Sequence, residues 1–323
     1  MLLDFIEVAI GLVLLFAAGD LLVRGAVSAG LRLSIPPILI GLTIVAFGTS
    51  APELLVTIKA AMEGVPGLAV GNVIGSNIAN VLLVIGLPAL LAPMGDHSAE
   101  TRRNYLIMML VTVVGVGLFY SSPLSLWQGV LLLTLLGLFL FDTYRTAMTS
   151  RAGGGEPLEA DDLDDGDPEM PNWKIFGLIG FGIVGLPVGA ELAVDGARNI
   201  ALDFGVSDEA IGLTLIALGT SLPELATTIM AALRSRADVA IGNVIGSNVF
   251  NILCILGVAA VLSDIDIAPE FLSLNVWVML GASAALAPFV LMRRNVNALT
   301  GSVFVAAYVA YVAVVLMPGA PPL

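Results

Sequence analysis

Two acidic residues lie in the middle of long apolar stretches, each directly after a proline and a short run of hydroxyl residues. Glu53 belongs to AFGTSAPELLVTI (residues 46–58), and Glu224 belongs to ALGTSLPELATTI (residues 217–229). At 1.5 Å per residue, Glu53 lies within about 8 Å of the middle of its stretch. If the stretch crosses a membrane, a carboxylate at that depth costs about 3 kcal/mol. We therefore interpret both glutamates as functional residues.

The residues before each glutamate predict a break in the helix. Pro52 lacks an N–H group, and its ring collides with the carbonyl group of Gly48. Gly48 itself adds backbone freedom. We expect the helix to open near residues 46–50 and to free the carbonyl groups around Ala46, and the second copy to free those around Ala217. Irregular backbone is tolerated at membrane depth only where protein buries it or a watery cavity borders it.

The two breaks carry oxygen atoms of the kind that hard cations prefer. The hydroxyl groups that join the carboxylates and the freed carbonyl groups belong to Thr49, Ser50, Thr220 and Ser221. Ca²⁺ and Na⁺ favour an environment made of oxygen ligands alone. An alternative stays open, because Ser50 and Glu53 have the spacing of a capping box, in which they would only satisfy N–H groups at a helix start. Two mirrored copies favour a cation site, and capping and ligation are compatible.

A polar stripe follows each break on the next apolar stretch. Residues that recur every fourth position share one face of a helix. The two stripes are Asn72, Ser76 and Asn80, and Asn243, Ser247 and Asn251. We interpret the neighbouring Asn77 and Asn248 as hydrogen-bonding residues between helices rather than as ligands. Two GxxxG pairs, which begin at Gly71 and at Gly242, predict close helix packing.

These motifs belong to an internal repeat. GLTIVAFGTSAPELLVTI (residues 41–58) matches GLTLIALGTSLPELATTI (residues 212–229), and GNVIGSN at residues 71–77 recurs unchanged at residues 242–248. Both blocks are separated by the same offset of 171 residues. A constant offset across two separate blocks indicates a duplication.

The composition predicts a membrane protein built of helices. Of the 323 residues, 58% are hydrophobic and 12% are charged, and the mean hydropathy is +1.00; a soluble domain is nearer to half apolar and a quarter charged. Apolar runs of about 18–25 residues indicate an all-α polytopic membrane protein rather than a β-barrel. We expect ten spans, the first a retained span and not a signal peptide, near residues 3–23, 34–58, 66–93, 104–120, 124–142, 173–194, 210–232, 239–262, 271–292 and 298–317.

An acidic segment divides the chain into two halves. Residues 156–169 hold eight of the 26 acidic residues and no basic residue, so residues 151–171 are predicted to be a disordered linker. The net charge of −13 arises largely there, and the absence of a basic surface argues against nucleic-acid binding. The first half is residues 1–150 with its repeat block at 41–80, and the second half is residues 172–323 with its repeat block at 212–251.

Each half is expected to hold five spans, and this odd number places the halves in opposite orientations in the membrane. Inverted repeats are typical of secondary transporters, whose sites lie near the midplane where broken helices of both halves meet. We therefore expect a transporter rather than an enzyme. The same offset aligns Asp20 with Glu191, which either line the entrances to the site or lie at helix interfaces.

The basic residues predict the orientation of the chain in the membrane. Eleven of the 13 Lys and Arg residues lie on alternate connections between the expected spans, and only Lys59 and Arg198 lie on the opposite side. The positive-inside rule places the eleven in the cytoplasm. Both termini are therefore expected outside the cell membrane, and the acidic linker is expected inside.

The duplicated GTSxPE and GNVIGSN motifs, in inverted halves of five spans, resemble those of the Ca²⁺/cation antiporter superfamily. The chain is most similar to the prokaryotic sodium/calcium exchangers, and the resemblance covers nearly its whole length. The ion ligands that this resemblance implies are the carboxylates of Glu53 and Glu224, the hydroxyl groups of Thr49, Ser50, Thr220, Ser221, Ser76 and Ser247, the amide of Asn80, and the carbonyl groups of Ala46 and Ala217. Asn251 stands at a position where the family has aspartate or asparagine. The asparagine argues against K⁺ co-transport, and the intact GTS segments favour Na⁺ over H⁺.

We therefore expect a secondary active antiporter that exchanges Na⁺ for Ca²⁺ by alternating access. No cofactor, nucleic acid or obligate protein partner is expected; the partners are the two ions and the lipid bilayer. The resemblance suggests that three Na⁺ replace one Ca²⁺, so that one net charge moves in each cycle, and that spans 1 and 6 slide over the motif spans. An H⁺/Ca²⁺ exchanger and a cation channel are the alternatives.

Overall fold

The computed structural model describes residues 1–95, 98–152, 167–204, 217–269 and 271–315. These residues form helices joined by turns, and the β-type pairings within them are two isolated bridges, Met94 with Val296 and Leu124 with Ile265. The all-α class predicted from the sequence is therefore confirmed. Of the predicted linker, residues 153–166 lie outside the described residues, whereas residues 151–152 and 167–171 belong to them.

Eight helices in the described part of the chain are long and apolar enough to cross a membrane, and one bent pair of helices makes a ninth span. The eight are Leu2–Leu33, Pro66–Leu91, Ala99–Phe119, Leu126–Thr149, Asn172–Asp203, Ala237–Leu262, Phe271–Leu291 and Ala298–Val315, and the bent pair is Ile38–Thr49 with Ala51–Met62. Each coincides with a predicted span. The remaining prediction, residues 210–232, begins outside the described residues and includes the apolar helix Leu222–Leu233.

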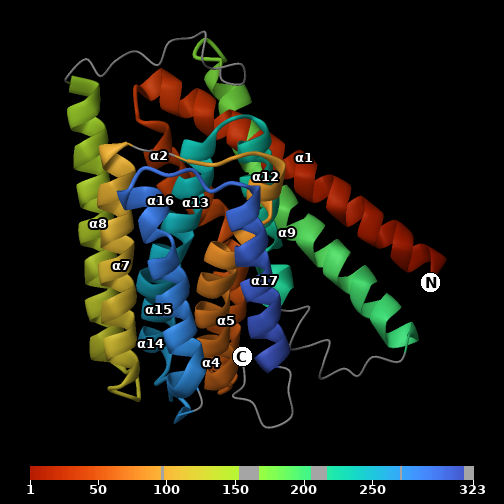
Figure 1. Cartoon of the computed structure of the whole chain (residues 1–323), viewed down its shortest axis with the longest axis vertical. Coiled ribbons are helices and arrows are strands. Elements are labelled where there is room, and N and C mark those ends of the chain that lie inside the picture. Colours follow the sequence, from red (N-terminus) through yellow and green to blue (C-terminus); the bar gives the residue numbers. More distant parts are fainter. Residues whose placement is uncertain (96–97, 153–166, 205–216, 270, 316–323) are drawn as a thin grey trace.

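Two 32-residue helices, α1 (Leu2–Leu33) and α9 (Asn172–Asp203), lie together at an angle to the other helices (Figure 1). Both extend well beyond the ends that hydropathy predicted. Polar residues near these ends make hydrogen bonds within the protein, and a hydropathy average does not take such bonds into account. Arg32 at the end of α1, for example, donates a hydrogen bond from Nη1 to the carbonyl oxygen of Met170, 2.8 Å away and just before α9.

The motif helices form the centre of the bundle. In the first half they are α2 (Pro37–Ile40), the π-helical turn η1 (Gly41–Val45), α3 (Ala46–Thr49), α4 (Ala51–Met62), α5 (Pro66–Ala79), the π-helical turn η2 (Asn80–Val84) and α6 (Pro88–Leu91). In the second half they are α11 (Ala217–Thr220), α12 (Leu222–Leu233), α13 (Ala237–Phe250), the π-helical turn η5 (Asn251–Ile255) and α14 (Leu256–Leu262). The spans that contain α5 and α13 are the most enclosed, with 78% and 83% of their apolar windows buried.

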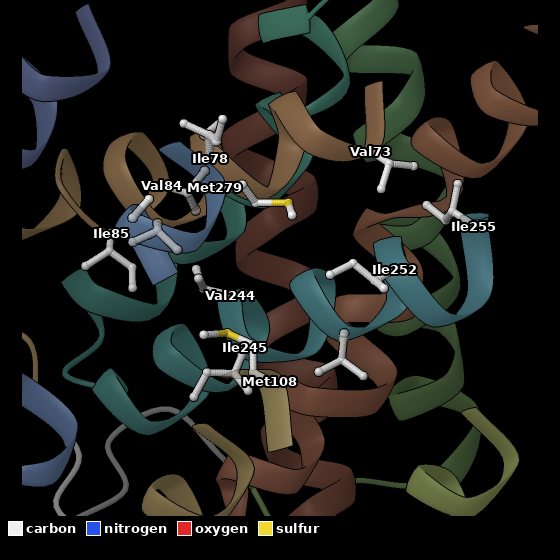
Figure 2. Close-up of a cluster of buried hydrophobic side chains, with 14 of the residues drawn as sticks. Val73, Ile78, Val84, Ile85, Met108, Val244, Ile245, Ile252, Ile255 and Met279 are labelled. Carbon is white, nitrogen blue, oxygen red and sulfur yellow. The ribbon is translucent and has the colours of Figure 1, made fainter. Parts of the chain in front are cut away.

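The remaining helices cover this centre. They are α7 (Ala99–Phe119), α8 (Leu126–Ala152), the π-helical turn η6 (Phe271–Asn275) with α15 (Val276–Ala285) and α16 (Ala287–Leu291), and α17 (Ala298–Val315). In Figure 1, α7 and α8 lie along one side and α1 with α9 along the other. Figure 2 shows the apolar cluster between the layers, where Met108 of α7 and Met279 of α15 meet side chains of both repeat blocks.

The predicted break in the second span is a bend of 47° between α3 and α4. It lies at Ser50, whose φ and ψ are −82° and 7°, and the equivalent Ser221 has nearly the same values, −87° and 1°. Residues 46–49 stay helical, so the break is narrower than predicted. The carbonyl oxygen of Ala46 is also not freed, because it accepts the N–H group of Ser50 at 3.0 Å.

Glycines let the two repeat blocks approach closely. A Cβ atom on Gly242 of α13 would lie 2.6 Å from the carbonyl oxygen of Ile38, and one on Gly246 would lie 2.7 Å from that of Leu42. The close packing predicted from the second GxxxG pair is therefore confirmed. At Gly75 in the first pair, an added Cβ atom meets no described residue within 4 Å, and residue 213, which the offset relates to Leu42, lies outside the described residues.

Candidate functional site

The two glutamates lie in the first turns of α4 and α12, at the points where the broken helices restart. Each is buried, with 1% of its surface exposed. The hydroxyl group of Ser50 donates a hydrogen bond to Oε1 of Glu224 at 3.0 Å, which links the two halves directly. The two carboxylates are also close enough to interact electrostatically. The sequence therefore brings two negative charges together in the centre of the bundle.

The capping alternative for the serines is not what the structure shows. Ser50 and Ser221 are the N-cap residues of α4 and α12, yet neither side chain makes a capping hydrogen bond. The Ser50 hydroxyl group turns to Glu224 instead, and the Ser221 hydroxyl group is buried without a partner.

Buried oxygen atoms without hydrogen-bond partners gather on the residues singled out by the sequence. Ten buried side-chain nitrogen or oxygen atoms lack a partner among the described residues, and seven of them belong to this set. The seven are Oε2 of Glu53 and Glu224, Oγ of Ser76, Ser221 and Ser247, and Oδ1 of Asn80 and Asn251. A buried polar atom left unpaired costs about 1–3 kcal/mol. A ligand that interacts with oxygen atoms, as a hard cation does, would satisfy all seven atoms on these two neighbouring helix pairs.

The first residue of each polar stripe braces the site and is not free to ligate. Asn72 donates from Nδ2 to the carbonyl oxygen of Glu53 at 3.1 Å and to Oγ1 of Thr57 at 2.8 Å. Asn243 donates in the same way to Oγ1 of Thr228 at 3.1 Å. Thr57 and Thr228 were not predicted from the sequence to belong to the site. Their signal was present, since each lies four residues after a glutamate in the repeat.

The hydroxyl groups of the threonines cross between the repeats. Thr49 donates to Oδ1 of Asn243 at 3.3 Å, and Thr220 donates to Oδ1 of Asn72 at 3.4 Å. The repeat relates these two bonds to each other, because the offset of 171 residues connects Thr49 with Thr220 and Asn72 with Asn243. Such reciprocity is the signature of an approximate two-fold axis that relates the halves. A hydroxyl group that donates its hydrogen keeps its lone pairs, so both threonines can still offer oxygen to a cation.

The last residue of each stripe begins a π-helical turn. Asn80 opens η2 and Asn251 opens η5. Asn80 donates from Nδ2 to Oδ1 of Asn248 at 3.1 Å, and Asn251 donates from Nδ2 to Oδ1 of Asn77 at 3.2 Å. The prediction that Asn77 and Asn248 are hydrogen-bonding residues between helices is confirmed. The π-helical turns, which are frequent at functional sites, were not predicted from the sequence.

The predicted carbonyl ligands are less clearly placed. The Ala46 carbonyl oxygen accepts the Ser50 N–H group. It also lies 3.3 Å from Oγ1 of Thr49, whose one hydrogen is shared between this oxygen and Oδ1 of Asn243. Ala217 is the first described residue of its segment, and the Ser221 N–H group donates to Leu218 rather than to Ala217, at 3.1 Å. No group of three or more His, Cys, Asp or Glu side chains suited to a metal occurs among the described residues. Among the described residues, the two glutamates are the acidic side chains at the site.

The aligned acids Asp20 and Glu191 have different surroundings. Asp20 lies at a helix interface, where its Oδ1 accepts a hydrogen bond from Nε of Arg234, at the end of α12. Glu191 is exposed on α9. Of the two roles considered for this pair, Asp20 therefore has the interface role.

A protein-family model described as "Sodium/calcium exchanger protein" matches residues 4–144 and 174–317, which is most of the chain. The chain belongs to the sodium/calcium exchanger family. This confirms the superfamily predicted from the duplicated motifs, whose members are membrane transporters rather than enzymes.

Individual relatives agree with the family over almost the full length. The chain is 40% identical to the putative antiporter CaxA of Alkalimonas amylolytica over 96% of this chain and 98% of CaxA. It is 31% identical to the sodium/calcium exchanger MaX1 of Methanosarcina acetivorans, again over 96% and 98%. Among solved structures, the sodium-calcium exchanger NCX_Mj, soaked with Na⁺ and Sr²⁺, superposes with a TM-score of 0.83 at 31% identity, over 98% of this chain and 99% of that chain.

Proposed function

We propose that the protein exchanges Na⁺ for Ca²⁺ across the cell membrane through the site between α4 and α12. The observation that carries the proposal is the set of seven buried oxygen atoms without partners, which includes one from each glutamate. Six to eight oxygen ligands with two carboxylates suit Ca²⁺. The names of MaX1 and NCX_Mj, both sodium/calcium exchangers, support Na⁺ as the counter-ion.

Antiport follows if both ions need the same two carboxylates. One Ca²⁺ balances the charge of Glu53 and Glu224, and Na⁺ ions that occupy the same oxygen atoms exclude it. If three Na⁺ leave as one Ca²⁺ enters, one net positive charge leaves in each cycle. The membrane potential then contributes about 2.3 kcal/mol per 100 mV.

The proposed arrangement in the membrane is ten spans in two inverted halves, residues 1–150 and 172–323, with both termini outside and the linker in the cytoplasm. The reciprocal hydrogen bonds between the repeats support a two-fold relation between the halves. Nine spans are visible in the described residues, and the apolar helix α12 belongs to the expected tenth. The distribution of Lys and Arg supports the orientation.

Ion flux in lipid vesicles tests the proposal. Vesicles that contain the purified protein are loaded with Na⁺ and diluted into Na⁺-free medium of equal pH that contains radioactive Ca²⁺. We expect Ca²⁺ uptake that stops when a Na⁺ ionophore collapses the gradient, and that becomes faster when the vesicle interior is made positive. The potential has this sign because net positive charge leaves the vesicle.

The same vesicles separate the alternatives. Uptake that follows a pH gradient and ignores Na⁺ would replace Na⁺ by H⁺ as the counter-ion. Ca²⁺ flux that needs no counter-ion at all would indicate a channel. Vesicles without protein give the background leak.

A further inference from the structure

Two matching chains of hydrogen bonds, each through three buried side chains, end at the candidate cation site. In one, Asn77 lies between Met279 and Asn251; in the other, Asn248 lies between Met108 and Asn80. Asn77 donates from Nδ2 to Sδ of Met279 at 3.7 Å, and Asn248 donates from Nδ2 to Sδ of Met108 at 3.7 Å. All six side chains are buried, and every residue in one chain is related to its counterpart by the 171-residue offset.

Each chain of hydrogen bonds has a direction that the sulfur atom sets. An asparagine amide has a donor end, NH₂, and an acceptor end, the carbonyl oxygen, whereas a thioether sulfur can only accept. The Met279 sulfur atom therefore takes the NH₂ group of Asn77, and this turns Oδ1 of Asn77 toward Asn251. Asn251 in turn must donate its own NH₂ group. Its Oδ1 is the atom left over, and it is buried without a partner.

The second chain repeats this logic. The Met108 sulfur atom takes the NH₂ group of Asn248, whose Oδ1 accepts the NH₂ group of Asn80 at 3.1 Å. Oδ1 of Asn80 is then the buried atom without a partner. Both chains begin at an atom that only accepts and end at an oxygen atom at the candidate site.

The surroundings of the two methionines make the direction hard to reverse. Figure 2 shows both in the apolar cluster, among valine and isoleucine side chains. Valine and isoleucine side chains accept no hydrogen bond, and the described hydrogen bonds place the two NH₂ groups on the sulfur atoms. If the Asn251 amide turned over, its oxygen would face the oxygen of Asn77, and its NH₂ group would point toward the cation. Both changes are repulsive.

We propose that Met279 with Asn77, and Met108 with Asn248, are positioning residues that fix the amide direction of Asn251 and Asn80, so that each presents oxygen rather than NH₂ to the transported cation. This inference rests on the proposed cation site. It assigns the four outer residues a role in ion affinity although none of them touches the ion.

Replacing the acceptor tests the role. Asn77→Leu keeps the size of the side chain but leaves the NH₂ group of Asn251 without its acceptor, so the amide can turn over. Loss of an outer partner of a metal ligand typically costs about 10–100-fold in metal affinity. We expect the KM for Ca²⁺ in the vesicle assay to rise by about that factor, while the uptake rate at saturating Ca²⁺ changes much less.

A change at the ligand itself separates positioning from packing. In Asn251→Asp, the side chain has two oxygen atoms and no NH₂ group, so it presents oxygen whichever way it turns. Adding Asn77→Leu to Asn251→Asp should therefore shift the KM for Ca²⁺ by no more than about twofold relative to Asn251→Asp alone, which is the tolerance of such comparisons. A merely structural role for Asn77 would give the same loss in both backgrounds.

The repeat supplies a second, independent copy of the experiment. Asn248→Leu is measured in the wild-type and the Asn80→Asp backgrounds, so one copy suffices if the other fails to fold, as judged by size-exclusion elution in detergent. Met279→Leu, which conserves volume, should raise the KM in the same direction as Asn77→Leu but by less, because sulfur is a weak acceptor.

The outcomes are distinct. An unchanged KM in Asn77→Leu, or an equal loss in both backgrounds, overturns the positioning role while Na⁺-driven uptake by the wild-type protein still stands. Absence of Na⁺-driven uptake by the wild-type protein overturns the proposed function itself.

Discussion

At the scale of single residues, the carboxylates of Glu53 and Glu224 are placed where a charge is costly and where no basic side chain pairs with them in the described hydrogen bonds and ion pairs. Each keeps one oxygen atom without a partner in the centre of the bundle. A fold gains nothing from such an arrangement unless a cation supplies the missing interactions. The glutamates are therefore expected to weaken the protein when no cation is bound and to strengthen it when one is.

This gives opposite predictions for stability and activity in Glu53→Gln. The substitution keeps the shape and removes one charge, and a charge pair 4 Å apart at an effective dielectric of 20 is worth about 4 kcal/mol. We expect Na⁺-driven Ca²⁺ uptake to disappear, while the melting temperature without Ca²⁺ stays the same or rises. Added Ca²⁺ should raise the melting temperature of the wild-type protein but not of the variant.

Glu63→Gln is the matched control for this experiment. Glu63 lies at the other end of α4, is exposed, and makes only a long ion pair of 4.0 Å with Lys59. Exposed pairs contribute little, so uptake and the Ca²⁺-dependent melting shift should stay close to those of the wild-type protein. Ca²⁺ uptake retained by Glu53→Gln would remove Glu53 from the site.

At the same scale, the sequence predicted which residue types lie at the site, but it predicted their individual roles only in part. Glu53 and Glu224 stand out because a buried charge has no structural explanation. Asn72 and Asn243 share a helix face with ligand candidates, yet they bond to Thr57 and Thr228. Which amide binds a neighbouring helix and which remains free depends on the rotation of one helix against another, and no local pattern encodes this.

At the scale of elements, Pro52 predicted the bend correctly, whereas the π-helical turns at Asn80 and Asn251 carried no signal. A proline acts on the carbonyl group four residues earlier, so its effect can be read locally. A π-helical turn accommodates one extra residue, and its position is decided by the partners of the side chains around it. Here those partners include Asn77 and Asn248 in the opposite repeat.

The close crossing of α13 over the broken second span gives an element-scale prediction. A Cβ atom on Gly242 would lie 2.6 Å from the Ile38 carbonyl oxygen, which is backbone and cannot move aside cheaply. Gly242→Ala should therefore push the two repeat blocks apart and lower stability by about 1–3 kcal/mol, the usual cost of overpacking. The melting temperature in detergent and the Ca²⁺ uptake rate should both fall.

Gly75→Ala tests whether this effect comes from the contact or from the loss of a glycine. Gly75 is also in a helix and in a GxxxG pair, but an added Cβ atom meets no described residue within 4 Å. Alanine is the better helix former, so the melting temperature should not fall. If Gly75→Ala and Gly242→Ala behaved alike, the close approach would not be the cause.

At the scale of the whole molecule, hydropathy predicted the all-α membrane class and the nine spans that the described residues contain. It did not predict that α1 and α9 would pack against each other so closely. A Cβ atom on Gly11 would lie 2.5 Å from the backbone nitrogen of Ala193, and one on Gly189 would lie 2.9 Å from that of Leu15. The two helices lie 139 residues or more apart in the sequence. Their register is set by the fit of one helix surface to the other, which neither helix sequence encodes alone.

The paired helices make a contact with the centre that breaks the symmetry of the repeat. Asp20 of α1 pairs with Arg234 at the end of α12. The offset of 171 residues replaces Asp20 by Glu191 and Arg234 by Glu63, so the equivalent pair is two acids that cannot form an ion pair. The ion pair can therefore hold α1 against α12 only at the end of the bundle that we assign to the cytoplasm.

This asymmetry is expected to bias alternating access. A contact that forms in only one of two conformations stabilises that conformation by the free energy of the contact. For a partly exposed pair this is up to about 1 kcal/mol, or about fivefold in the population ratio. Asp20→Asn should therefore shift the protein away from the conformation with α1 and α12 together. Spin labels on Leu33→Cys and Leu233→Cys, after replacement of the single Cys254, would report this as a longer distance between the helix ends.

Charge exchange decides whether the ion pair itself is responsible. The double variant Asp20→Arg with Arg234→Asp restores an ion pair in reversed order and should return the distance distribution toward that of the wild-type protein. Glu191→Gln is the symmetry-related control and should leave the distance unchanged, because Glu191 is exposed on α9. If Asp20→Asn left the distance between the helix ends unchanged, the ion pair would be a local contact without influence on which side of the membrane the site faces.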